Sequence, residues 1–311
     1  MIAEALIYQV GLLFLMLIPG ILLAKCGLST EGLGKGLANL VLYIAQPALI
    51  VVAYIRAFDQ NILFNAIWVF VFSILSHFLF AAIAFSCFRK ADAAKQKVLR
   101  FATVFSNAAY MGIPLIVAVL DAEAAIYASI YNITFNLFLW SLGVVICTGD
   151  KKQASLKKVL FHPVTISAFV GIAIFLLPIE NYVPQILIEG MNMLKDLVAP
   201  LSMIIIGLRL ANLKFKGIFR DRYLYEFLFI RMLLLPVLVF AIMKGLSFVL
   251  PGINQTVMTV ILVTAATPAA TATSMFAEKY DGDATYAGTL VSISTLLAVL
   301  TMPLVSLLLN L

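Results

Sequence analysis

The sequence predicts an all-α membrane protein of ten transmembrane helices, arranged as two inverted five-helix repeats. Three observations lead to this fold class: an extreme apolar composition, regularly recurring apolar stretches, and a weak internal repeat. Hydrophobic residues make up 63% of the 311 positions and charged residues only 12%, whereas soluble domains are about half apolar and about a quarter charged. This composition excludes a soluble fold of this size. The Lys and Arg residues are scattered in short breaks between apolar stretches rather than gathered in one patch, so no nucleic-acid partner is expected.

Ten apolar stretches, bounded by charged residues or by Gly, Pro and Asn, are the expected spans. They cover residues 5–24, 36–56, 61–88, 98–120, 123–148, 160–179, 191–211, 223–248, 254–277 and 284–310. Most have the roughly 18 to 25 residues that cross about 30 Å of hydrocarbon. The first lacks the basic start and small-residue cleavage site of a signal peptide, so we interpret it as a span. The longest polar gap, Thr148 to Lys158, separates the expected repeats 1–150 and 151–311.

Basic residues fall mainly on one side of these spans. Of the 21 Lys and Arg residues, seventeen lie in connections on one side, three lie on the other, and Arg231 lies within a span. Because cytoplasmic connections are enriched in Lys and Arg, the seventeen are expected to face the cytoplasm. With an even number of spans, both termini are then predicted to lie outside a cytoplasmic (inner) membrane.

Two short sequence echoes suggest the repeat. Residues Asp121–Ala124 follow the fourth span and Asp281–Ala284 follow the ninth, 160 residues later; Ser106–Ala109 and Thr267–Ala270 are related by nearly the same offset. Because five is odd, the second unit must enter from the opposite face, as in many secondary transporters. Asp121 and Glu123 are also expected to cap the fifth span, since Asp favours helix starts.

The fourth and ninth spans each carry polar residues and a proline near mid-membrane. The fourth contains Asn107, Gly112 and Pro114, and the ninth contains Thr264, Thr267, Pro268, Thr271, Thr273 and Ser274. Proline removes a backbone donor and clashes with the preceding turn, which predicts a helix interruption at each place. Paired interruptions indicate a transporter's binding site, and half-helix N-termini there favour an anion. We therefore predict a substrate site at Asn107, Gly112, Pro114, Thr267, Pro268 and Thr271. The alternative is that proline is merely tolerated and the hydroxyls bond back to their own helices.

Four further polar residues lie inside spans, and each has two interpretations. Asn132 and Asn136 are one turn apart and either face the site or form amide bonds between helices. Arg231 lies nine residues after Arg222, about 13 Å deep by helix rise, so it is either a functional charge or is bonded to backbone carbonyls or an unseen carboxylate. His77 is either a proton carrier or a neutral histidine bonded to a neighbouring helix.

The segment Asn107–Leu115 has the pattern Asn-x-x-x-Met-Gly-Ile-Pro-Leu. This element resembles one of the auxin efflux carrier family, which includes plant PIN-FORMED proteins and bacterial carriers of small carboxylates, and it is the most specific part of the resemblance. The supporting segments are Tyr43–Leu49, Asn136–Gly143, Ala199–Leu201, Arg231–Pro236 and Phe276–Tyr280. The chain departs from the plant proteins in its short middle connection and in Thr267–Thr271, where they carry a Pro-Gln-Gly element, which argues against auxin as substrate.

The resemblance implies that the broken fourth and ninth helices cross near the midplane, with the family's site asparagine at Asn107. It also implies a transport domain of spans 3–5 and 8–10, a scaffold of spans 1, 2, 6 and 7, and elevator-like alternating access, often in a dimer. The expected function is secondary transport of a small mono- or dicarboxylate without a cofactor, with Na⁺ or H⁺ as candidate coupling ions. A homodimer is compatible with the sequence, which leaves the oligomeric state open.

Two other classes of function were weighed. An intramembrane enzyme would need a nucleophile with a base, a carboxylate pair or a metal cluster. His77 and His162 are the only histidines, and Cys26, Cys87 and Cys147 have no metal-ligand spacing, so neither an enzyme nor a metal site is expected. A channel or a transporter-derived sensor of the same fold remains the alternative, and saturable exchange flux would distinguish a carrier from it.

Overall fold

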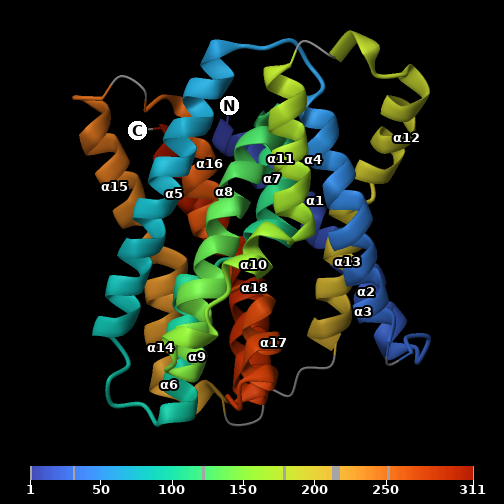
Figure 1. The fold of residues 1–311 in the computed structure, drawn as a ribbon. Helices are drawn as coiled ribbons and strands as arrows, with labels where there is room; N and C mark the ends of the chain where they lie inside the picture. Colours follow the sequence, from blue (N-terminus) through green and yellow to red (C-terminus); the bar gives the residue numbers. More distant parts are fainter. Residues whose placement is uncertain are drawn as a thin grey trace.

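The computed structural model describes residues 2–30, 32–120, 123–177, 180–211, 218–250 and 253–310, and every regular element in them is helical (Figure 1). The first half contains α1 (Ile2–Leu15), α2 (Leu17–Lys25), α3 (Leu33–Leu40), α4 (Gln46–Tyr54), α5 (Gln60–Ser86), α6 (Ala93–Val104), α7 (Ile113–Leu120), α8 (Ala124–Phe138) and α9 (Val144–Thr148). The second half contains α10 (Leu156–Leu160), α11 (Pro163–Leu176), α12 (Gln185–Lys195), α13 (Val198–Ala211), α14 (Arg222–Phe229), α15 (Leu235–Ser247), α16 (Gln255–Ala266), α17 (Ala272–Lys279) and α18 (Ala284–Ser306). Asp121, Lys214 and Lys216 lie outside the described residues.

Six helical segments of the described chain are long and apolar enough to cross a bilayer. They are Glu4–Lys25, Leu33–Tyr54, Gln60–Ser86, Ala124–Thr148, Arg222–Ser247 and Ala284–Asn310. A seventh candidate is the pair Lys151–Leu160 and Pro163–Leu176, which is bent by 46°. The other stretches expected to span, at 98–120, 191–211 and 254–277, are each divided into two shorter helices. The structure thus bears out a multi-helix membrane fold.

Of the four π-helical turns in the described part of the chain, three stand just before a proline. The turns Val41–Ala45, Ala108–Gly112 and Ile230–Leu234 each end two residues before Pro47, Pro114 or Pro236, while the fourth turn covers Leu139–Gly143. A proline ring clashes with the carbonyl four residues earlier, and a wider turn moves that carbonyl aside. Pro114 therefore sits inside a continuing helix, as the second residue of α7.

A side chain from another helix compensates for the missing N–H of Pro114. In π-helical register that N–H would bond the carbonyl of Ala109, and Gln46 Nε2 donates to this carbonyl instead, at 2.9 Å. Gln46 is fully buried. The interruption predicted at Pro114 lies earlier, at residues 105–107, where α6 has ended.

In two pairs of helices, a glycine lets the backbone of one helix closely approach the other helix. A Cβ built on Gly207 of α13 would lie 2.2 Å from the Leu17 carbonyl oxygen, and one on Gly20 of α2 would lie 2.2 Å from the Ile204 oxygen. In α11, a Cβ on Gly171 would lie 2.3 Å from the Tyr54 ring at the end of α4. Small residues permit such approaches in membranes, where close packing rather than exclusion of water holds helices together.

Two segments that carry basic residues can be located relative to the chain termini. Both marked chain ends lie in the upper part of Figure 1, whereas the link after α5 and the end of α17 lie at the bottom. The link after α5 carries Arg89 and Lys90, and α17 ends at Lys279. These basic segments therefore lie at the end of the bundle opposite to the chain termini.

Candidate substrate-binding site

The two helix interruptions meet inside the protein. Residues Phe105–Asn107, after α6, and residues Thr267–Thr271, after α16, run antiparallel, with a β-bridge between Ser106 and Ala269. Asn107 N–H donates to the Pro268 oxygen at 2.8 Å, and Ala270 N–H donates to the Phe105 oxygen at 2.9 Å. We call these two segments the crossover. Each satisfies backbone groups of the other, which is how an unwound segment persists in surroundings without water.

Four helix ends converge on the crossover. The C-terminal ends of α6 and α16 lead into it; the π turn that continues into α7, and the helix α17, lead out of it. Helix N-termini carry partial positive charge and unbonded N–H groups. Asn107 stands at the first of these N-termini, and its side chain makes no capping hydrogen bond. The arrangement favours an anion beside the starts of the turn at Ala108 and of α17.

Unsatisfied polar atoms are associated with the crossover. Among the described residues, Asn107 Nδ2 and Arg231 Nε have no hydrogen-bond partner, and Ser106 Oγ and Tyr131 OH have none within 3.5 Å, although the two hydroxyls lie near each other; all four residues are at most 2% exposed. Buried polar groups in native proteins are nearly always bonded to protein, water or a ligand. These donors and hydroxyls can bond a polar ligand without disrupting existing bonds.

Arg231 contributes a buried cation. Its Nη2 donates to the backbone carbonyl oxygen of Thr267 at 2.9 Å, and its Nη1 lies 3.5 Å from the backbone carbonyl oxygen of Thr103. Its guanidinium also lies over the Phe80 ring, 5.5 Å from the centroid. Of the interpretations open from sequence, the structure has the bonds to backbone carbonyls, and no described carboxylate forms an ion pair with Arg231.

The predicted threonines and glycine line the crossover mainly through packing and local bonds. Thr267 Oγ1 donates to the Thr264 oxygen at 2.8 Å. A Cβ on Gly112 would lie 3.6 Å from a Thr264 methyl and 3.7 Å from a Thr267 methyl, which places the π turn against the end of α16. The backbone carbonyl oxygen of Thr271 lies 3.4 Å from Arg209 Nη1. These residues and Pro268 therefore lie together with Asn107, while Pro114 lies further along, in α7.

The side-chain amides of Asn132 and Asn136 donate hydrogen bonds within their own helix. Asn132 Nδ2 donates to the Ala128 oxygen at 2.9 Å, and Asn136 Nδ2 donates to the Asn132 oxygen at 3.0 Å. The alternative of amide bonds between helices is wrong for these two donors, because the preceding turn of the same helix supplies an acceptor at the right spacing.

His77 is likewise bonded within its own helix. Its Nδ1 lies 2.7 Å from the Ser73 oxygen, which makes Nδ1 the protonated nitrogen, and its ring stacks on Phe138 at 4.8 Å between centroids. The predicted bond to a neighbouring helix is therefore wrong. His77 Nε2 has no partner among the described residues, and the Tyr131 ring lies 5.5 Å from the imidazole.

Two residues beside the crossover were missed from sequence, and for a third, Tyr131, packing is the role that the sequence favours. Ser294 Oγ of α18 accepts from Ala269 N–H at 3.2 Å, and Gln46 supports the turn before Pro114. Tyr131 brings an unbonded hydroxyl. Only Gln46 carried a signal, an amide beside a proline inside an apolar span.

A polar network lies near the ends of α4 and α8. Arg56 Nη1 and Glu123 Oε2 are 2.7 Å apart, and Tyr127 OH donates to Glu123 Oε1 at 2.8 Å. Glu123 occupies the N-cap position of α8, as predicted, but its carboxylate accepts from Arg56 and Tyr127 and makes no capping hydrogen bond to α8. This network joins the segment after α4 to the start of α8.

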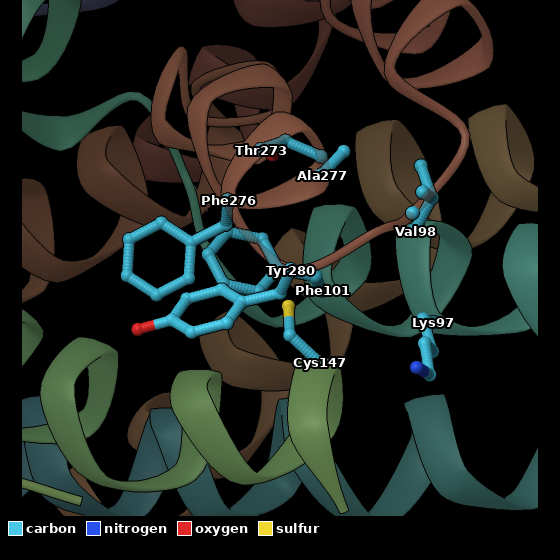
Figure 2. Close-up of a pocket in the computed structure, with 9 residues that line it drawn as sticks. Lys97, Val98, Phe101, Cys147, Thr273, Phe276, Ala277 and Tyr280 are labelled. Carbon is cyan, nitrogen blue, oxygen red and sulfur yellow. The ribbon is translucent and has the colours of Figure 1, made fainter. Parts of the chain in front are cut away.

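A separate small cavity lies between α6, α9 and α17. Figure 2 shows the rings of Phe101, Phe276 and Tyr280 grouped beside Cys147, with Lys97 apart from them on the right, below Val98. Its volume is about 10 Å³, enough for about one water molecule. The cavity is too small to hold a carboxylate. It lies beside the crossover, because the ring centroids of Phe101 and Phe105 are 4.6 Å apart.

Comparison with known proteins supports the resemblance seen in the sequence. A profile of the family described as "Membrane transport protein" matches residues 5–158 and 151–306. An "Uncharacterized transporter" of Methanothermobacter thermautotrophicus is 25% identical over 296 residues, which cover 93% of each chain. The family assignment from sequence is thereby confirmed, as is the placement among multi-pass membrane transport proteins rather than enzymes. The chain belongs to the membrane transport protein family of auxin efflux carrier-like (AEC) proteins.

Proposed function

We propose that this protein is a secondary transporter that carries a small organic anion, a mono- or dicarboxylate, across the cytoplasmic membrane. The observation that carries the proposal is the crossover: two interrupted helices that bond each other, with two half-helix N-termini and unbonded donors of Ser106 and Asn107 in one buried place. Carboxylates match these features, because oriented N–H groups and helix dipoles stabilise negative charge. No cofactor is required.

The proposed architecture is ten spans in two inverted repeats. In such a chain the first span corresponds to the sixth and the second to the seventh, so a contact between spans one and seven is the counterpart of one between two and six. The close packings of α2 against α13 and of α4 against α11 are such a pair. Contact between spans four and nine is its own counterpart and is supported by the crossover bonds.

The same contacts support a division into two moving bodies. Glycine-mediated packing joins span one to span seven and span two to span six, all four of which belong to the proposed scaffold. Around the crossover, spans eight and ten each contribute a bond, through Arg231 and Ser294, to the proposed transport domain. Elevator-like movement of one body against the other would expose the crossover to each side in turn. We further propose that both termini face outward and that the scaffold forms a homodimer.

Uptake by purified protein in liposomes tests the transport proposal. We expect saturable, exchangeable uptake of a labelled mono- or dicarboxylate, whereas a channel would give flux that does not saturate or exchange. Asn107→Ala should abolish most uptake with little change in melting temperature, because Asn107 Nδ2 has no hydrogen-bond partner among the described residues and the side chain does not cap the turn.

Asn136→Ala is the matched control for Asn107→Ala. Its amide is also buried in a span, but it bonds its own helix, so its effect on uptake should be much smaller. Unchanged uptake by Asn107→Ala, or equal losses in the two variants, would remove the crossover from the proposed site.

A further inference from the structure

Arg231 satisfies two helix ends at once. It is 0% exposed and lies in the π turn Ile230–Leu234, from which it reaches the oxygens of Thr103 and Thr267. Thr103 is the penultimate residue of α6, and Thr267 directly follows the last residue of α16. The Thr103 carbonyl belongs to the final turn of α6 and the Thr267 carbonyl to the C-cap residue of α16, where carbonyls have no partner within the helix.

The positive charge of Arg231 is balanced by the partial negative charges of the two helix ends that it contacts. Each helix C-terminus carries a partial negative charge of about half an elementary charge, so two ends together present about one negative charge. One guanidinium supplies one positive charge. Because no described carboxylate forms an ion pair with Arg231, the helix ends and the Phe80 ring are its counter-charge.

Carbonyls of this kind are cation ligands in other carriers built from inverted repeats. There, unwound backbone and half-helix C-terminal ends coordinate a coupling sodium or proton. We propose that Arg231 is a resident cation of the crossover, which occupies the carbonyls that would otherwise bind sodium, so that the protein works without sodium. This inference rests on the proposed transport function.

Arginine has the properties that this role requires. Its guanidinium stays charged at any physiological pH, and its rigid fork of N–H donors can serve two acceptors at once. A bound sodium leaves with each transport cycle, whereas a side chain cannot. The helix ends therefore remain neutralised in every state of the cycle, and the sodium gradient supplies no driving force through this place.

Thermal unfolding without substrate tests the proposal. The purified protein is melted in equal concentrations of sodium, potassium or choline chloride, and we expect the same melting temperature in all three. In Arg231→Ala the two carbonyls lose their cation. We expect a lower melting temperature that sodium raises selectively and saturably, since a ligand that binds only the folded state stabilises it. Arg231→Lys keeps a cation and should show no selective sodium effect.

Arg100→Ala is the matched control. Arg100 lies in α6, the helix that contains Thr103, but its guanidinium stacks over Phe85, 4.9 Å from the centroid. This variant should respond to salts as the wild type does. A selective sodium shift in the wild type contradicts the proposal, and so does a folded Arg231→Ala that no cation stabilises. If Arg231→Ala fails to fold, the wild-type and Arg231→Lys measurements still decide. Because no substrate is present, failure of carboxylate uptake leaves this result unaffected.

Discussion

Replacement of Gly207 by alanine should loosen the contact between α2 and α13. The new Cβ would lie 2.2 Å from the Leu17 oxygen, 3.1 Å from the Gly20 Cα and 3.1 Å from the Ile21 nitrogen. Real Cβ contacts are essentially never shorter than 3.0 Å, so the two backbones must separate by at least 0.8 Å. All three neighbours are backbone atoms, so no side-chain rotation can relieve the clash.

The expected loss follows from two opposing terms. Overpacking of a tight core costs about 1–3 kcal/mol, and a clash with backbone places this site at the upper end. Alanine gains about 1 kcal/mol over glycine in helix propensity. The net destabilisation of Gly207→Ala should therefore be about 2 kcal/mol.

Gly190→Ala is the control that separates the steric effect of the new methyl group from the gain in helix propensity. Gly190 lies in α12, and a Cβ there would meet nothing within 4 Å. Melting of the purified variants should place Gly207→Ala below the wild type and Gly190→Ala at or above it. A Gly207→Ala protein as stable as Gly190→Ala would refute the close approach of these helices.

Two polar contacts give further predictions. Arg56→Gln should lower the free energy of unfolding by at most about 1 kcal/mol, because the side chains of Arg56 and Glu123 are 31% and 34% exposed. Melting in low and high salt should show this loss shrinking as salt screens the pair. A loss that does not depend on salt would contradict the prediction. The hydrogen bond to Asp221 raises the pKa of Lys95 above its ordinary value. The contact therefore contributes fully below the ordinary lysine pKa of about 10.4 and is lost as pH rises through the higher folded value. The melting difference between the wild type and Lys95→Gln should accordingly vanish at strongly alkaline pH, and a constant difference would count against the bond.

The membrane fold and the two interruptions were predictable because each depends on local sequence. The length of an apolar stretch determines whether it can cross a bilayer, and polar residues beside prolines mark weak points in a helix. The position of the first break was predicted only approximately. Pro114 widens the preceding turn rather than breaking the helix, and the chain unwinds at residues 105–107 because the segment after α16 pairs with it.

The partners of polar side chains were not predictable, because contacts between distant residues decide them. Gln46 bonds the Ala109 oxygen, 63 residues away, and Arg231 contacts the Thr103 oxygen, 128 residues away. For Asn132 and His77 the opposite happened: an acceptor one turn back in the same helix took the donor. Sequence alone cannot rank a local acceptor against a distant one when both are buried.

The crossover also constrains how the protein is made. Residues 93–120 leave the ribosome well before residues 255–279, yet the Phe105 oxygen and Asn107 N–H find their partners only in Ala270 and Pro268. Until those residues arrive, these groups cannot rest in hydrocarbon, where an unsatisfied backbone group costs several kcal/mol. In the proposed ten-span architecture, membrane insertion of the fourth apolar stretch would therefore be completed only after Ala270 has been synthesised, and a chain that stops short of Ala270 would keep these backbone groups unpaired.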